Sequence, residues 1–157
     1  MTKLKVGDQA PDFSGINQNG KLISLDQFIG RPLVLFFYPK DDSKTCTNEA
    51  CEFRDKYSSF TNAGADVIGI SNDDPESHTH FISKNNLPYT LISDKDGEIA
   101  KKYGVHKELL FFPGRTTFIL NKEHKIIGTH SSLIDASSHI KESLKVIDHM
   151  KGGTPVH

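Results

Sequence analysis

The sequence predicts an α/β fold in which helices flank a mixed central β-sheet, and three observations support this. Two continuous apolar runs, near 33–37 and 66–71, are typical of strands that are covered on both faces and lie inside a sheet. Segments with apolar residues at helical spacing alternate with these strands. Near the end of the chain, two strand-like segments are joined by a short polar turn, which indicates a hairpin.

The first elements alternate between strand and helix. A strand is expected at 22–25, and the central strand follows at 32–38. Segment 47–62 is predicted to be a helix that ends near Gly64, because one stripe of its surface carries the apolar residues Ala50, Phe53, Tyr57 and Phe60. This stripe would pack on the sheet.

The middle of the chain repeats the pattern. A second buried strand is expected at 66–71, and the polar segment 72–74 supplies a helix cap. Pro75 suits the first position of a helix that runs through Asn85, because proline lacks the N–H that would be unpaired there. A strand at 88–93 follows.

The last third of the chain completes the sheet. A short helix is expected at 97–103, and strands at 115–120 and 125–130 form the predicted hairpin. Apolar residues at helical spacing then predict a closing helix over about 136–150. We expect one domain over 1–157, with an ordered core at about 4–150 and a loose tail at 151–157.

Composition argues against several classes of function. Lys plus Arg number 19 against 20 Asp plus Glu, and the basic residues are spread along the chain, so we expect no nucleic-acid partner. No stretch is apolar and long enough to span a bilayer, so no membrane association is expected. The first residues lack the apolar core of a secretory signal, which favours the cytoplasm, or an organelle stroma after removal of a targeting peptide.

The two cysteines of the chain, Cys46 and Cys51, lie five residues apart at the start of a predicted helix. Ser43 or Thr45 could cap this helix, and either cap places Cys46 in its first turn. Unpaired N–H groups and the partial positive charge of a helix start favour a thiolate there. We therefore expect Cys46 to be a reactive and accessible thiol.

The spacing of the two cysteines excludes a disulfide on an intact helix. Five residues of regular helix rise ~7.5 Å and rotate ~140°, which places the two α-carbons roughly 8.6 Å apart. A disulfide needs α-carbons within roughly 7 Å. Cys46 and Cys51 could therefore pair only if the first turn unwinds, which suggests a redox cycle rather than a structural crosslink. An inert, inward-facing Cys51 is the alternative.

Four segments of the chain resemble peroxiredoxins, most closely the Q-type group that includes the bacterioferritin comigratory proteins. They read GDQAPDF at 7–13, FFYPKDDSKTCT at 36–47, EACEFRD at 49–55 and PGRTTF at 113–118. The resemblance implies a thioredoxin-like fold with an N-terminal β-hairpin and the reduction of hydroperoxides without a cofactor or metal. It also implies a monomer, recycled by thioredoxin or a glutaredoxin-like reductant.

The resemblance also assigns roles to residues. Cys46 maps onto the peroxidatic cysteine, which is oxidised to a sulfenic acid, and Cys51 maps onto the resolving cysteine of the same chain. Arg115 suits the stabilisation of both the thiolate and the peroxide oxygens, because its charge is permanent and its donors form a fork. Ser43 could hydrogen-bond the peroxide, and Pro39 could shield the sulfur from water. Glu49, one turn beyond Cys46, could hold Arg115.

Other interpretations remain open at this point. Q-type sequences commonly have proline and a small residue just before the reactive cysteine, whereas this chain has Lys44 and Thr45, so its rate and peroxide preference could differ. A thiol-disulfide oxidoreductase lacks support because there is no Cys-x-x-Cys motif. A redox sensor that forms a mixed disulfide with a partner is a third possibility.

Several residues have a plain structural interpretation. Arg115 could instead form a surface salt bridge. The pair His78 and His80 resembles metal ligands only superficially, because further ligands are missing from its neighbourhood in the sequence. The pair Phe111 and Phe112 could provide an apolar docking surface beside the site or simply pack within a loop.

Overall fold

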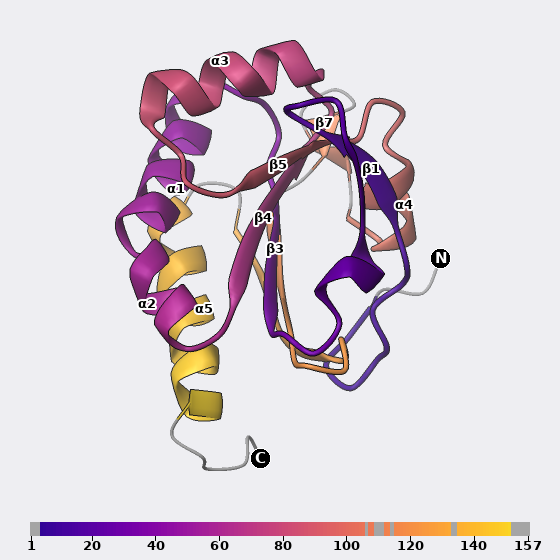
Figure 1. The fold of residues 1–157 in the computed structure, drawn as a ribbon, viewed down its shortest axis with the longest axis vertical. Coiled ribbons are helices and arrows are strands. Elements are labelled where there is room, and N and C mark those ends of the chain that lie inside the picture. The colour runs from indigo at the N-terminus through magenta and orange to yellow at the C-terminus, as the bar shows by residue number, and fades with distance from the viewer. Residues whose placement is uncertain (1–3, 106, 109–111, 114, 133–134, 152–157) are drawn as a thin grey trace.

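One seven-stranded sheet organises the protein, with helices packed on both of its faces (Figure 1). The structure is a computed structural model, and it describes residues 4–105, 107–108, 112–113, 115–132 and 135–151. The strands of the sheet are β1 Ser14–Asn17, β2 Leu22–Ser24, β3 Leu33–Phe37, β4 Asp66–Ser71, β5 Thr90–Ser93, β8 Thr116–Leu120 and β9 Ile126–Ser131. The helices are α1 Lys44–Asp55, α2 Tyr57–Asn62, α3 Pro75–Asn85, α4 Glu98–Lys102 and α5 Ala136–Lys151.

The sheet is mixed, as the sequence predicts. Its strand order is β2-β1-β5-β4-β3-β8-β9. The three inner strands β3, β4 and β5 run parallel, because helical segments carry the chain back between them. An N-terminal hairpin, β1 and β2, extends the sheet antiparallel to β5, and the C-terminal hairpin, β8 and β9, extends it antiparallel to β3.

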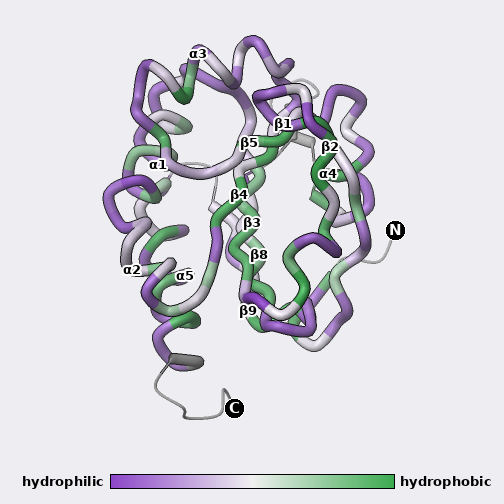
Figure 2. The backbone as a smooth tube through the Cα atoms, viewed as in Figure 1, coloured by the Kyte–Doolittle hydropathy of each residue, from purple (hydrophilic) through white to green (hydrophobic). Residues whose placement is uncertain are grey.

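Strand β3 is apolar throughout because it is buried on both faces. Leu33, Leu35 and Phe37 belong to a core on the side of α4 and the N-terminal hairpin. Val34 and Phe36 belong to a second core that contains residues of α1, α2, α3 and α5. Figure 2 shows this concentration of hydrophobic residues along the central strands, between more hydrophilic outer segments. The last residues of β3 therefore lead directly into the α1 region from the centre of the molecule.

Helices α1, α2 and α5 lie together on one side of the sheet, while α4 and the N-terminal segments lie on the other (Figure 1). Phe53 of α1 stacks on Phe36 of β3, with ring centroids 4.5 Å apart, and also contacts Phe60 of α2. Ile140 and Ile147 of α5 are buried in the same core. This packing fixes α1 against the sheet along most of its length.

The structure differs from the sequence prediction mainly in where elements begin and end. The predicted helix 47–62 is two helices, because the backbone at Lys56, with φ −105° and ψ 6°, leaves the helical range. The apolar stripe continues across this break, so the hydrophobic spacing could not reveal it. Strand β5 begins at Thr90 rather than at residue 88, and the predicted helix 97–103 is ordered as Glu98–Lys102.

Some elements were not predicted individually. β1 has only four residues, a 3-10 helix spans Leu25–Phe28, and β6 Lys107–Glu108 pairs with β7 Phe112–Pro113 in a separate two-stranded sheet. Residues 152–157 of the expected tail lie outside the described residues. In the part of the chain that is described, no helix combines the length and apolar character needed to cross a membrane.

Candidate active site

The loop between β3 and α1 carries the motif that the sequence singles out. Ser43 is the N-cap of α1, and its hydroxyl accepts a hydrogen bond from the backbone N–H of Cys46 at 3.3 Å. The same hydroxyl donates to the carbonyl of Lys40 at 3.2 Å. Of the two caps that the sequence allowed, the structure therefore selects Ser43, and Cys46 lies in the first turn of α1 as predicted.

Cys46 lies beneath the surface rather than on it. Its exposed fraction is 1%, so the expected accessibility is wrong for this conformation. The cause is its position on the face of α1 that packs with Tyr38, Ala50 and Phe53 in the core. A substrate therefore meets a sulfur in a largely desolvated environment, where fixed charges and donors act more strongly than in water.

Arg115 provides such a charge. It immediately precedes β8, the strand next to β3, and its side chain is almost fully buried. Its Nη2 donates to the Sγ of Cys46 at 3.2 Å, and its Nη1 donates to Oε1 of Glu49 at 2.5 Å. The structure thus brings Cys46, Glu49 and Arg115 together as the sequence analysis expected, and the surface salt-bridge interpretation of Arg115 is wrong.

The Glu49–Arg115 pair is unusual because neither partner is exposed to solvent. Burial raises the pKa of Glu49 to about 8, although the neighbouring Arg115 opposes the rise. Burial also lowers the pKa of Arg115, but Glu49 and Cys46 outweigh this and hold it above its ordinary value. Arg115 is therefore a permanent cation shared between two acidic groups, the thiol and the carboxyl.

His139 of α5 is a member of this site that the sequence analysis did not identify. It is fully buried, and its Nδ1 lies 3.7 Å from Oε2 of Glu49. Its Nε2 lies 2.9 Å from the carbonyl of Ser132 and must donate to it, so the neutral Nδ1 accepts from the hydroxyl of Thr117 at 2.8 Å. Burial lowers the pKa of His139 to about 4, which keeps the ring neutral.

The second oxygen of Glu49 is left without a hydrogen bond by this arrangement. Oε2 is buried, has no hydrogen-bond partner, and faces the lone-pair side of a neutral imidazole. Protonation of Glu49 would remove the buried negative charge from this unpaired oxygen, which agrees with the raised pKa. The spacing of apolar residues on α5 could not reveal that His139 contacts a residue 90 positions earlier in the chain.

Cys51 lies on the second half of α1, away from Arg115, and is partly exposed. Its Sγ lies 3.7 Å from Oδ1 of Asn85, the last residue of α3. Both cysteines are free, and both lie within the continuous helix Lys44–Asp55. The obstacle expected from the sequence is therefore present, because an intact helix keeps the two α-carbons beyond disulfide range.

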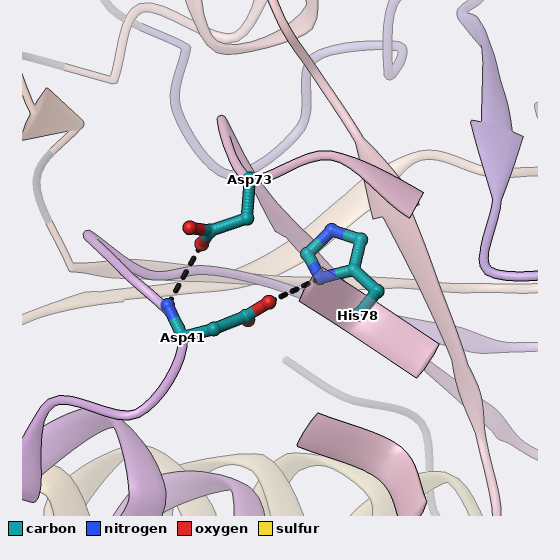
Figure 3. Close-up of side chains that lie close together, drawn as sticks. All are labelled: Asp41, Asp73 and His78. Atoms are coloured by element: carbon teal, nitrogen blue, oxygen red, sulfur yellow. Dashed lines mark hydrogen bonds and ion pairs between the residues drawn. The ribbon is translucent and has the colours of Figure 1, made fainter. Parts of the chain in front are cut away.

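A buried network anchors the loop that precedes Ser43 (Figure 3). Oδ2 of Asp41 lies 2.8 Å from Nδ1 of His78 on α3, and the backbone N–H of Asp41 donates to Asp73 at 2.7 Å. Oδ1 of Asp41 accepts from the hydroxyl of Tyr38, and Oδ2 also accepts from Ser77. These contacts tie the Cys46 loop to α3.

The geometry of Asp41, Asp73 and His78 would also permit a metal ion, since their ligand atoms lie within 4.8 Å of one another. Their ligand atoms are, however, already used in hydrogen bonds, including one from the other ring nitrogen of His78 to the carbonyl of Ile92 at 3.1 Å. We interpret the cluster as structural. His80, by contrast, is exposed, so the two histidines of the sequence pair do not converge.

The remaining predicted residues are less fully described. Pro39 is half-buried in the loop between β3 and the Ser43 cap. Lys44 is exposed and Thr45 is half-buried beside Cys46 in the sequence. Phe111 lies outside the described residues, as does the side chain of Phe112, so the docking-surface hypothesis stays a prediction.

Comparison with known proteins identifies relatives for almost the whole chain. A model of the AhpC/TSA family matches residues 6–129. Peroxiredoxin Q, chloroplastic, of Populus jackii is 42% identical over 151 residues, covering 96% of this chain and 71% of the relative. Peroxiredoxin Q, chloroplastic, of Arabidopsis thaliana is 45% identical over 148 residues, covering 94% of this chain and 68% of the relative.

Solved structures of peroxiredoxins also resemble this chain. Peroxidoxin BcpB of Mycobacterium tuberculosis superposes with a TM-score of 0.88 at 33% identity, covering 94% of this chain and 98% of the other. A bacterioferritin comigratory protein of Xanthomonas campestris, described with an alkyl peroxide reduction activity, superposes with a TM-score of 0.86 at 25% identity. That match covers 94% of this chain and 99% of the other. The expected thioredoxin-like fold is thereby confirmed.

Proposed function

Because the chain belongs to the AhpC/TSA family, and within it to the peroxiredoxin Q group, it is a thiol peroxidase, and we propose which residues carry the reaction. In this proposal Cys46 is the peroxidatic cysteine and Cys51 resolves its oxidised form. A thioredoxin-like or glutaredoxin-like dithiol protein then reduces the resulting disulfide. The substrates are hydrogen peroxide and organic hydroperoxides.

The first step is attack of the Cys46 thiolate on the terminal oxygen of a hydroperoxide. The S–O bond forms as the O–O bond breaks, and the departing alkoxide or hydroxide takes up a proton to leave as alcohol or water. The product on the protein is the Cys46 sulfenic acid. Negative charge moves from sulfur to the departing oxygen, so a fixed cation next to the sulfur stabilises both the start and the end of this movement.

The observation that supports this step most directly is the contact of Arg115 with both Cys46 and Glu49. One guanidinium reaches the sulfur while its other arm is held by a buried carboxyl, so its direction is fixed before substrate arrives. Ser43 already serves as donor and acceptor beside Cys46, and we propose that it also hydrogen-bonds the peroxide. Pro39 shields the sulfur from water in the same proposal.

The second step joins the two cysteines. The Cys51 thiol attacks the sulfenic sulfur, the S–S bond forms, and the hydroxyl of the sulfenic acid leaves with the thiol proton as water. Because both residues lie on α1, at least the first turn must unwind for the sulfurs to meet. The Ser43 cap and the Arg115 contact are the interactions that this unwinding breaks.

Family membership also supports proposals about the oligomeric state and the cellular location of the protein. We propose that residues 1–157 act as one domain and as a monomer without a cofactor, with no nucleic-acid or membrane partner. The plant relatives are named as chloroplastic proteins, which favours the organelle stroma over the cytoplasm as the location. Size-exclusion chromatography with light scattering measures the oligomeric state.

Pre-steady-state oxidation tests the proposed role of Cys46. Purified, reduced protein is mixed with hydrogen peroxide or cumene hydroperoxide, and consumption of the peroxide is followed in competition with a reporter peroxidase. Cys51→Ser should retain rapid oxidation and accumulate a sulfenic acid, whereas Cys46→Ser should lose it. Oxidation of Cys46 no faster than that of free cysteine, or equal rates in the two variants, would overturn the assignment.

A further inference from the structure

The Cys51 side chain contacts the end of α3, and this contact differs from those at Cys46. Asn85, the last residue of α3, directs its side-chain oxygen toward the Cys51 sulfur at 3.7 Å. The direction of this amide is fixed, because its Nδ2 donates to the carbonyl of Phe81 at 3.0 Å. The oxygen can only accept, so the Cys51 thiol donates its proton to Asn85.

Arg54 reinforces the same junction from α1. Its Nη1 donates to the backbone carbonyl of Asn85 at 2.8 Å, one of the carbonyls that the end of a helix leaves unpaired. Arg54 lies three residues after Cys51, on the same side of the helix. A third contact, from the hydroxyl of Tyr89 to the carbonyl of Ala50 at 2.7 Å, fixes the adjacent turn.

These contacts divide α1 into two parts. The second half, from Ala50 to Arg54, is tied to the end of α3 and to the segment before β5. The first turn depends on the Ser43 cap and on Arg115. When the first turn unwinds, the contacts of the second half need not break, and Cys51 can remain in place.

The guanidinium of Arg54 is held from two sides. Its Nε donates to Oδ1 of Asp55 at 2.9 Å, while its Nη1 donates to the carbonyl of Asn85. Arg54 therefore links α1 to the end of α3 in one fixed geometry next to Cys51.

We propose that Asn85 and Arg54 are positioning residues for the resolving step. Asn85 holds the Cys51 thiol in one orientation against the end of α3, and Arg54 holds Asn85 in place through its backbone carbonyl. This inference rests on the proposed function of Cys51 as the resolving residue. It concerns only the second step, because neither residue contacts Cys46, Arg115 or Glu49 in the hydrogen bonds described above.

The experiment separates the two steps by rapid quench. Reduced protein receives one equivalent of hydrogen peroxide, samples are quenched with acid, and mass spectrometry quantifies sulfenic acid, disulfide and sulfinic acid at each time. Asn85→Ala should slow disulfide formation about threefold to tenfold, because the freed Cys51 thiol samples several orientations, and the Cys46 sulfenic acid should persist longer. The rate of Cys46 oxidation should stay unchanged.

A conservative variant distinguishes positioning from simple loss of structure. Arg54→Ala should slow disulfide formation in the same way as Asn85→Ala, and Arg54→Lys, which can still donate to the carbonyl of Asn85, should restore the rate. Arg31→Ala is the matched control, since Arg31 is an exposed arginine that pairs with Asp66 on another part of the surface. Far-UV circular dichroism verifies the helix content of every variant.

The outcomes identify which idea fails. If the unsubstituted protein forms no disulfide between Cys46 and Cys51, the proposed resolving role of Cys51 is wrong. If it forms the disulfide but Asn85→Ala and Arg54→Ala match its rate of disulfide formation, the positioning inference is overturned. Faster disulfide formation in Asn85→Ala would also overturn it, because Asn85 would then restrain Cys51 rather than position it.

Discussion

Replacing Glu49 by glutamine should change how stability depends on pH. Glu49 is fully buried, and its pKa rises from an unfolded value of 4.5 to about 8 in the folded protein. The folded state therefore binds more protons than the unfolded state between these values, and stability falls as pH rises through this window. At about 1.4 kcal/mol per pH unit, the whole window corresponds to at most about 5 kcal/mol.

The titration of His139 limits the pH range in which the contribution of Glu49 to stability can be measured alone. Burial lowers its pKa from 6.5 to about 4, so the unfolded state binds more protons there and stability rises with pH over that range. Below pH 6.5 the contributions of Glu49 and His139 to the pH dependence of stability oppose each other. Above pH 6.5 the contribution of Glu49 remains. Between pH 6.5 and 8 we expect the protein to lose about 2 kcal/mol of stability, and Glu49→Gln to lose almost none.

Urea unfolding followed by far-UV circular dichroism measures this difference at pH 6.5, 7, 7.5 and 8. Circular dichroism suits the chain because it has no tryptophan to report by fluorescence. Both proteins carry Cys46→Ser, so that ionisation of this thiol cannot contribute to either curve. Parallel stability curves for the two proteins across this range would refute the reasoning, because they would show that Glu49 does not titrate there.

Three further perturbations test other parts of the site. Arg115→Lys should slow Cys46 oxidation by about 10-fold to 100-fold, because a single ammonium cannot replace two charge-assisted contacts at once. A rate within twofold of the unsubstituted protein, measured in competition with a reporter peroxidase, would contradict this. Ser43→Ala should cost the first turn of α1 about 1 kcal/mol, seen as faster amide hydrogen exchange at Cys46 and contradicted by unchanged protection. Asp41→Ala should destabilise the protein by about 3 kcal/mol because it leaves His78 without its buried partner, whereas Asp41→Asn should destabilise it far less. Equal urea midpoints for these two variants would contradict a stabilising role of the Asp41–His78 contact.

The fold was largely predictable because its central strands are buried on both faces. A run such as 33–37 has no polar position, and only a strand inside a layered α/β protein tolerates that. Short edge elements such as β1 and the β6–β7 pair carry too few residues for a periodic pattern. The break at Lys56 escaped prediction because hydrophobic spacing records which side of a helix is buried and not whether its axis is continuous.

The site was predictable where its residues lie close together in the sequence or within a recognisable motif. Ser43, Cys46 and Glu49 share one helix start, so their relative placement follows from helix geometry. Arg115 was found only through the family resemblance. His139 and Asn85 contact the site from α5 and α3, and such tertiary contacts leave no signal in one sequence.

The burial of Cys46 has the same origin as these missed contacts. Helix geometry correctly placed the thiol in the first turn of α1, but it could not determine which face of that turn packs against the sheet. Cys46 is buried in the same core as Tyr38 and Phe53. The reactivity expected of Cys46 therefore depends on the charge of Arg115 in a buried environment rather than on exposure to solvent.

Mass spectrometry of the protein under non-reducing conditions, after one equivalent of hydrogen peroxide, tests the central claim most directly. The account predicts a monomer that has lost two hydrogens, with Cys46 joined to Cys51 in the peptide map. A disulfide between two chains, or a sulfenic acid that persists at Cys46 while Cys51 remains a free thiol, would contradict it.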